Sequence, residues 1–319
     1  MARICVIGSL NVDIFMGVEQ FPRAGENVVA SSFQVFTGGG KGANQAYALG
    51  RLGAEVTMVG KVGDQFYGLN YLQVLKESRI NCDYIGIEPD MYSGIGVVAV
   101  NQSGENSIYV YPGANGKVDI AYLEGCWDAI EEHELFLFQL EIPLEATLYA
   151  MEKLRGSGKR IIFDPAPAGP LPDAIYARVD YITPNQSELE ALSGMLIQEE
   201  KDFAVAANIL LAKGATTVIA KAGARGAYIV TGEEVTHVPG FRVNTVDTTA
   251  AGDSFNAGLA YALAEGMDLT QSVRFANAVA ALATTAMGAQ QAMPLLHEVE
   301  ELMSESETDS SRSRVGHRL

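Results

Sequence analysis

The chain has 319 residues, of which 48% are hydrophobic and 19% charged, and its formal net charge is −17 at pH 7. This composition is typical of a globular protein rather than a disordered one, and the length allows a large buried core. The negative charge argues against nucleic acid as a partner, because a phosphate backbone is bound by a basic surface. If such a chain binds an anionic ligand, backbone amides or bound cations must supply the positive potential locally.

The three cysteines, Cys5, Cys82 and Cys126, are scattered and have no C-x-x-C spacing. They predict neither a disulfide framework nor a zinc site. The N-terminus enters an apolar, strand-like run without a signal-peptide pattern. No apolar run reaches the roughly 18 residues expected of a membrane span. We therefore expect a cytoplasmic protein that does not enter a membrane.

Short apolar runs typical of buried strands alternate with helical patterns along most of the chain. The predicted strands are 4–7, 55–59, 135–140, 161–163, 181–182 and 217–220. The predicted helices between them are 41–53, 68–78, 144–156, 186–193 and 200–213. This alternation indicates βαβ units, and hence an α/β fold with a mostly parallel central sheet covered by helices on both faces.

Two regions interrupt the alternation, at about residues 12–36 and 92–111. Both are β-rich, contain turn residues and lack an intervening helix. We expect antiparallel excursions from the main sheet, which would form a lid over its edge.

The pattern becomes helical from Gly252 onward, and residues 273–286 are apolar nearly all round, as in a helix packed inside a large domain. Residues 304–319 are rich in Ser, Glu and Arg without periodicity, which predicts a disordered tail. The remainder, residues 1–303, is predicted to form one domain, since no linker divides it.

The first glycine-rich segment, residues 37–46, reads TGGGKGANQA. It is not a P-loop, because Lys41 is followed by Gly42 and the G-x-x-x-x-G-K spacing is absent. The first strand is not followed by G-x-G-x-x-G either, which disfavours a dinucleotide-binding enzyme. Lys41 and Asn44 are three residues apart at a predicted helix start, so both can face one small polar ligand. The alternative is a flexible loop that merely caps this helix.

The second segment, residues 246–256, reads VDTTAAGDSFN. Small residues, Ala250, Ala251 and Gly252, lead into a helix whose first turn carries Asp253. Unhindered amides at a helix N-terminus bind anions. A carboxylate beside such a site suits a base that deprotonates a nucleophile attacking the anion. The alternative is that Asp253 only complements the helix dipole, worth about 0.3–1 kcal/mol, but that explains neither the small residues nor the preceding Asp247.

Both segments resemble the signatures of the ribokinase family of carbohydrate kinases, which includes adenosine kinases and fructokinases. The resemblance extends from about residue 3 to residue 300. It implies a three-layer α/β sandwich with a small β-sheet lid that often forms a homodimer interface. It also implies phosphorylation of a small sugar by ATP, with O5 of ribose as the expected acceptor.

The resemblance implies roles for individual residues as well. The expected catalytic groups are the base Asp253 and the phosphoryl-stabilising amides of Ala250, Ala251 and Gly252. The residues expected at the sugar are Asn11, Asp13, Gly40, Lys41, Asn44, Glu141 and Asp253. Those expected at ATP and its Mg²⁺ are Asn185, Glu188, Lys221, Gly223, Gly226, Gly252 and Asn277. Those expected at a K⁺ site are Asp247, Thr249, Ala283, Ala286, Gly288 and Ala292.

The sequence leaves open the roles of several residues and the identity of the substrate. Asn185 and Glu188 also fit a plain helix start, and Asp164, at the end of a predicted strand, fits a turn as well as a ligand site. The substrate of a related kinase could be 2-deoxyribose, fructose or a nucleoside, and a nucleoside would need an aromatic slot. The phenylalanines of the predicted lid are candidates for such a slot: Phe15, Phe33 and Phe36. A non-catalytic sensor is disfavoured by the intact Asp253 and its anion site.

Overall fold

The computed structural model describes residues 2–232 and 234–315, with side chains through residue 306. The strands are β1 (Ile4–Ile7), β2 (Asn11–Gly17), β3 (Ser32–Gly39), β4 (Val56–Gln65), β5 (Ile80–Tyr92), β6 (Gly94–Val100), β7 (Asn106–Tyr111), β8 (Leu135–Phe138), β9 (Arg160–Phe163), β10 (Tyr181–Ile182), β11 (Thr217–Lys221), β12 (Ala227–Thr231) and β13 (Glu234–Val238). The α-helices are α1 (Lys41–Arg51), α2 (Gly68–Glu77), α3 (Ile120–Gly125), α4 (Trp127–Ile130), α5 (Leu144–Leu154), α6 (Gln186–Ser193), α7 (Glu200–Ala212), α8 (Ala251–Ala264), α9 (Leu269–Ala283) and α10 (Leu296–Val315). Short 3₁₀ helices are η1 (Gly113–Lys117), η2 (Asp173–Arg178), η3 (Gly223–Arg225) and η4 (Gln290–Ala292).

The main sheet of the described chain has nine strands in the order β13-β12-β11-β10-β9-β8-β1-β4-β5. All neighbours are parallel except β12, which is antiparallel to both β11 and β13. The predicted α/β fold with a mostly parallel sheet is therefore confirmed. None of the helices in residues 2–232 and 234–315 combines the length and hydropathy needed to cross a bilayer.

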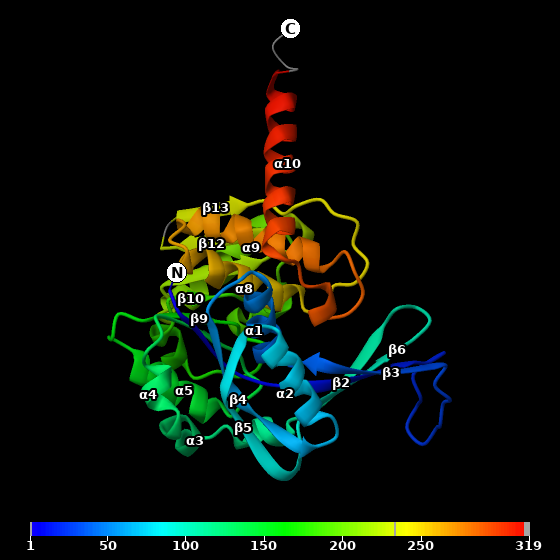
Figure 1. Ribbon diagram of the computed structural model, residues 1–319. Coiled ribbons are helices and arrows are strands. Elements are labelled where there is room, and N and C mark those ends of the chain that lie inside the picture. Colours follow the sequence, from blue (N-terminus) through cyan, green and yellow to red (C-terminus); the bar gives the residue numbers. More distant parts are fainter. Residues whose placement is uncertain (1, 233, 316–319) are drawn as a thin grey trace.

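Strand β1 shows why the apolar runs predict buried strands. Its four residues are fully buried, and alternate side chains join two separate hydrophobic clusters. Ile4 and Val6 belong to the cluster that includes residues of α1, α8 and α9. Cys5 and Ile7 belong to the cluster that includes residues of α3, α5 and α7. The sheet is thus covered on both faces, and Figure 1 shows α3, α4 and α5 lying apart from α8 and α9.

The strand order reverses at β1, since the chain builds β4 and β5 on one side of it and β8 to β13 on the other. In open α/β sheets, ligands bind beyond the carboxyl ends of the strands near such a reversal. The segments that follow β1, β8, β9, β10 and β11 all emerge at this edge, because these strands are mutually parallel.

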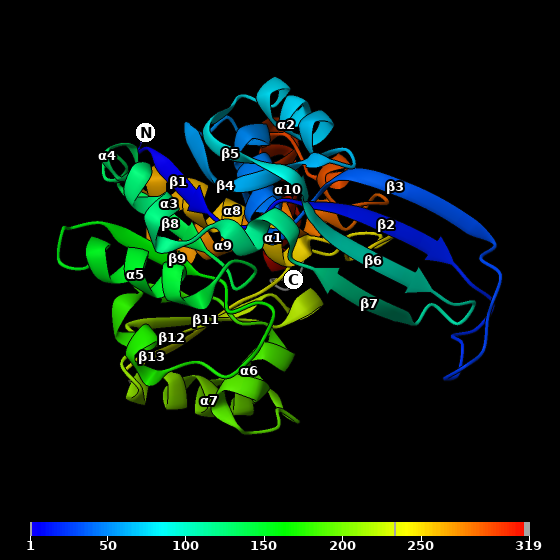
Figure 2. The same cartoon turned by 90° about the horizontal axis from the view of Figure 1, so that it is seen from below.

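A second sheet, with the strand order β3-β2-β6-β7, projects from the main sheet as the predicted lid (Figure 2). Its outer pairs are antiparallel, as expected, but β2 and β6 pair in parallel. The prediction of purely antiparallel excursions was wrong in this respect. Strand β2 follows β1 and β6 follows β5, and both leave the same edge of a parallel sheet, so they run in the same direction.

The last helices differ from the prediction at their boundaries. Helix α9 begins at a capping box formed by Asp268 and Gln271 and ends at Ala283 rather than residue 286. Helix α10 continues through most of the segment 304–319, for which the composition predicts disorder. No Gly or Pro occurs between Leu296 and Val315 to interrupt it. Residues 316–319 lie outside the described part.

Packing of α8 against α9 depends on Gly258, where an added Cβ would lie 2.9 Å from Ala276 Cα and 2.9 Å from Val279 Cγ2. We expect Gly258→Ala to lower stability by about 1–3 kcal/mol, because the two helices would have to separate. Thermal melting would show this as a Tm lower by several degrees. The matched control is Gly125→Ala, also in a helix, where an added Cβ meets nothing within 4 Å. Equal melting temperatures for the two variants would contradict the packing argument.

Candidate active site

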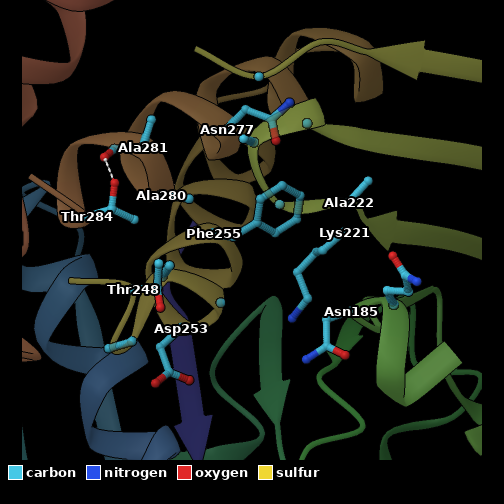
Figure 3. Close-up of a pocket in the computed structure, with 18 of the residues that line it drawn as sticks. Asn185, Lys221, Ala222, Thr248, Asp253, Phe255, Asn277, Ala280, Ala281 and Thr284 are labelled. Carbon is cyan, nitrogen blue, oxygen red and sulfur yellow. Dashed lines mark hydrogen bonds between the residues drawn. The ribbon is translucent and has the colours of Figure 1, made fainter. Parts of the chain in front are cut away.

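A cavity of about 1200 Å³ opens at the carboxyl edge of the main sheet. It is bounded by the ends of β9 to β11 on one side, and by the start of α8 and the end of α9 on the other. In Figure 3 the side chains of Asp253, Lys221 and Asn185 approach one another at one end of it, while Phe255 and Asn277 line the other. The cavity is thus polar at one end and more apolar at the other.

Asp253 lies in the first turn of α8 and is only 5% exposed. Its carboxylate accepts hydrogen bonds from Asn44 Nδ2 at 3.0 Å and Gln45 Nε2 at 3.2 Å. Burial raises the pKa of Asp253 to about 6, although the charge of Lys41 opposes the shift. A carboxylate with this pKa is ionised at neutral pH and remains a competent proton acceptor.

The residues just before Asp253 are those predicted to bind an anion. Ala250 adopts a left-handed conformation, with φ 58°, as N-cap of α8, which is unusual for a residue with a side chain. The Ala251 amide donates to the Thr248 carbonyl at 3.2 Å. The amides of Ala250 and Gly252 have no acceptor within the described chain and remain available to an anion.

The first glycine-rich segment passes directly beside the start of β2. Gly40, the N-cap of α1, has φ 84°, and an added Cβ there would lie 2.7 Å from Asn11 N. Glycine is therefore required for both conformation and space. Lys41 begins α1 and lines the cavity. Burial lowers its pKa, but the carboxylates of Asp253, Asp164 and Glu141 outweigh this effect and raise the pKa above its usual value.

Asn11 and Asp13 begin the lid strand β2 and lie against glycines of β6. They pair with Gly94 and Gly96, and a Cβ on either glycine would meet their side-chain oxygens within 2.4 Å. Both side chains therefore point to the same face of the lid. Burial, together with the charges of Glu141 and Asp253, raises the pKa of Asp13 to about 7.

Glu141 follows β8 and faces the start of α1. Its Oε2 accepts hydrogen bonds from the Ser9 hydroxyl at 2.5 Å and from the Lys41 backbone amide at 2.9 Å. These hydrogen bonds hold Glu141 at the first turn of α1, which carries Lys41 and Asn44.

Asp164, which the sequence left open between a turn and a ligand role, is buried and paired with Lys221. The Lys221 Nζ lies 3.1 Å from Asp164 Oδ1, and their side chains are 11% and 3% exposed. Gln45 Nε2 donates to Asp164 Oδ2 at 3.1 Å and also to Asp253. Lys221 Nζ lies 3.4 Å from the position of a Cβ on Gly252, so the amine is next to the anion site.

Asn185 and Glu188 form a helix start and also lie at the cavity, so the structure is compatible with both interpretations of their sequence. They form a capping box at the start of α6, in which Asn185 Oδ1 accepts from the Glu188 amide at 2.9 Å and the Glu188 carboxylate accepts from the Asn185 amide at 2.7 Å. Both residues also line the cavity. Burial raises the pKa of Glu188, although Lys221 opposes the shift.

The loop after β11 lines the cavity together with the end of α9. Gly223 and Gly226 have φ 60° and 95°, and a Cβ on Gly226 would lie 2.1 Å from the Val238 carbonyl. Asn277 Nδ2 donates to the Val238 carbonyl at 3.0 Å and also lines the cavity. These residues surround an open space without occupying it.

Asp247 and Thr249 lie behind the anion site. Asp247 Oδ1 accepts from the Thr249 amide and hydroxyl, and its Oδ2 accepts from the Gly288 amide at 2.9 Å. Burial raises the pKa of Asp247, but these donors outweigh it and hold the pKa below its usual value. Ala283 ends α9, Ala286 and Gly288 follow in the next loop, and Ala292 ends η4. The structure thus brings Asp247 and Thr249 to Gly288.

Sequence reasoning missed Gln45 and Asn115, two amide residues within this network. Asn115 Nδ2 donates to Asn11 Oδ1 at 2.7 Å, and Gln45 connects Asp164 with Asp253. Gln45 lies inside the first glycine-rich segment, which is a usable signal. Asn115 lies in η1, and nothing in its local sequence marks it.

Comparison with known proteins assigns the family. A model described as "pfkB family carbohydrate kinase" matches residues 1–296. The chain belongs to this family of carbohydrate kinases. A ribokinase from Bacillus subtilis is 41% identical over 95% of the chain and 100% of that protein. A deoxyribokinase from Salmonella typhimurium is 35% identical over 95% and 99%. The solved structure of a ribokinase from Arabidopsis thaliana, complexed with ribose and ATP, aligns with a TM-score of 0.86 at 29% identity and covers 94% of this chain and 98% of that one.

Membership of a kinase family gives Asp253 a testable role. Asp253→Asn keeps the shape and the helix but removes the proton acceptor, so we expect turnover to fall by about 10²–10⁴. Melting temperature and nucleotide affinity should stay close to those of the wild type. Near-full activity in this variant, measured by coupled ADP release, would show that Asp253 is not the base.

The pH profile provides a second test of the same residue. Because Asp253 must be ionised to accept a proton, kcat/KM should fall as the pH decreases through about 6. The Asp164 charge helps to raise the pKa of Asp253, so Asp164→Asn should shift this acidic limb to lower pH. Asp83→Asn, at an exposed position, is the control. An acidic limb unchanged in Asp164→Asn would contradict the coupling of the two carboxylates.

Proposed function

We propose that this protein transfers the γ-phosphoryl group of ATP to O5 of D-ribose, giving ribose 5-phosphate and ADP, in the cytoplasm. The observation that carries the proposal is the position of Asp253. This buried carboxylate lies between the amide and acid groups facing the lid and the large cavity at the ends of β9 to β11. The similar ribokinases, including one solved with ribose and ATP, support this choice of substrates.

The polar groups near the lid suit a sugar. Asn11, Asp13, Asn44 and Glu141 offer amides and carboxylates, the groups that recognise hydroxyls. Ionised carboxylates accept hydrogen bonds from hydroxyls, whereas amides both donate and accept. The large cavity suits ATP. Its phosphates would lie toward the free amides before Asp253, and its adenine ring toward the more apolar end near Phe255.

In the proposed reaction, O5 loses its proton to Asp253 and attacks the γ-phosphorus. A new O5–P bond forms as the bond from the γ-phosphorus to the β,γ-bridging oxygen breaks, and ADP leaves with that oxygen. The amides of Ala250 and Gly252 stabilise charge on the transferred group. Lys221, beside Gly252, adds a positive charge there, and Asp164 holds its amine in place.

The chain's own residues are consistent with a metal that binds together with the nucleotide. In residues 2–232 and 234–306 no group of three or more His, Cys, Asp or Glu side chains is arranged to hold a metal ion. Mg²⁺ in kinases is typically held by one or two carboxylates and by the phosphates, and Glu188, with Asn185, borders the cavity for this purpose. When bound, Mg²⁺ neutralises charge on the phosphate oxygens.

We also propose a K⁺ site behind the anion site, at Asp247 and Thr249 and the loop that carries Gly288. The donor set suits a monovalent cation, because the hydrogen bonds to Asp247 keep it ionised and its Oδ2, which accepts from the Gly288 amide, retains a second lone pair. The hydrogen bond from the Val246 amide to the Thr284 carbonyl, at 2.7 Å, holds the two segments together.

The face of the lid that points away from the site is apolar, and we propose that it forms a homodimer interface. Strand pairing places Val12, Ile14 and Met16 opposite the face that carries Asn11 and Asp13. The cross-strand partners on that outer face are also mainly apolar: Phe33, Val35, Ile95, Val97, Ala99, Tyr109 and Tyr111. Phe33 is 65% and Tyr109 69% exposed, and exposed apolar surface of this kind marks an interface.

A single charged substitution on this face tests whether it forms the dimer interface. We expect Tyr109→Asp to produce monomers in light scattering after size exclusion, because an unpaired carboxylate in an apolar interface is costly to desolvate. The control is Leu196→Asp, at a position 70% exposed in the segment between α6 and α7. A wild type that is already monomeric would refute the interface.

The choice of ribose is tested by substrate preference. Asn11 lies beside Asp13 on the inner face of the lid, so loss of a sugar hydroxyl there leaves a buried polar group unpaired. This costs about 1–3 kcal/mol, or up to roughly a hundredfold in preference. We expect a higher kcat/KM for ribose than for 2-deoxyribose, and Asn11→Met to narrow or reverse the gap. A wild type that prefers 2-deoxyribose, or that uses only a nucleoside, would overturn the ribose assignment and leave the family assignment intact.

A further inference from the structure

Two buried asparagines meet where the lid joins the main sheet. Asn11 begins β2 and is 4% exposed, whereas Asn115 lies in η1 and is 1% exposed. Asn115 Nδ2 donates to Asn11 Oδ1 at 2.7 Å. The contact joins residues 104 positions apart in the chain.

A backbone amide fixes the orientation of both side chains. The Leu10 N–H donates to the Asn115 side chain at 2.9 Å, and a backbone N–H can only donate. The atom facing it must therefore be Oδ1, which turns Nδ2 of Asn115 toward Asn11. Asn11 must then present its own oxygen to Asn115, and its Nδ2 is directed elsewhere. The amide orientations thus follow from the network.

The surroundings leave the Asn11 amide nitrogen available to a ligand. Gly94 closes one side, since a Cβ there would lie 2.0 Å from Asn11 Oδ1 and 2.3 Å from Asn115 Nδ2. Within the described chain, Asn11 Nδ2 has no hydrogen-bond acceptor, and it is not among the enclosed side-chain atoms that lack a partner. It is therefore accessible. Asp13 lies beside it on the same face, with its oxygens against Gly96.

We propose that Asn115 is a positioning residue for substrate selection, which forces Asn11 to offer the sugar an N–H donor beside the Asp13 carboxylate. A hydroxyl suits this pair, because its oxygen accepts from Asn11 while its proton is donated to Asp13. A sugar that lacks the hydroxyl leaves both groups unpaired. This inference rests on the proposed function, since it assumes a pentose in the site.

Asn115→Asp tests the proposal directly. One oxygen of the new carboxylate still accepts from Leu10, but the other now faces Asn11 Oδ1, so the Asn11 amide should turn over and present its oxygen to the sugar. We expect kcat/KM for ribose to fall about tenfold to a hundredfold, mainly through KM. The preference for ribose over 2-deoxyribose should shrink toward one. The Kd of ribose measured by calorimetry should rise in parallel.

Asn11→Asp is the second variant, in case the first does not fold. It keeps an acceptor for Asn115 Nδ2 and removes only the donor toward the sugar, so it should reduce the same preference. Asn208→Asp, an exposed position in α7, controls for the added charge. If wild type phosphorylates ribose and the preference ratios stay unchanged in both variants, the inference is wrong and the proposed function stands. If wild type phosphorylates no pentose, the proposed function fails, and the inference fails with it.

Discussion

The burial of several carboxylates side by side is the constraint on which the rest of the site depends. Asp13, Glu141, Asp164, Glu188 and Asp253 gather at one edge of the main sheet, in a chain whose net charge is already −17. A buried carboxylate without partners is very costly. Lysines are few here, so amides donate most of the hydrogen bonds that stabilise these carboxylates. Side-chain amides donate to Asp253, and a backbone amide donates to Glu141. This explains why amide side chains accompany the carboxylates of the site.

Gln45 shows how this solution connects the two ends of the site. Gln139 Nε2 donates to Gln45 Oε1 at 2.6 Å, so the Gln45 nitrogen must face the acids. Its two protons are shared between Asp164 and Asp253. Asp164 in turn holds Lys221. The group we assign as base and the amine we assign to the phosphates are therefore positioned by one buried amide.

The sequence predicts the elements that local patterns control. Apolar runs mark the buried strands, and small residues before Asp253 mark the start of α8, because those signals lie within a few positions. The parallel pairing of β2 with β6 is not a local property, since it follows from the edge at which each strand leaves the main sheet. Asn115 is likewise invisible in sequence, because its importance depends on a backbone amide 105 residues away. Helix α10 shows a different limit of sequence-based prediction. A polar composition without periodicity predicts disorder, but it does not exclude a local helix.

The loop that carries Gly288, proposed to bind a cation, is connected to Asp253 through hydrogen bonds within the protein. At one end Gly288 donates to Asp247, in the turn that leads to the anion site. At the other, Gln290 Nε2 donates to Tyr71 Oη at 2.7 Å and to Asn44 Oδ1 at 3.3 Å. Asn44 Nδ2 in turn donates to Asp253, so the loop contacts the amide that binds this carboxylate. A cation at the proposed site would therefore lie in a loop that contacts both Asp247, before the proposed anion site, and the Asn44 amide at Asp253.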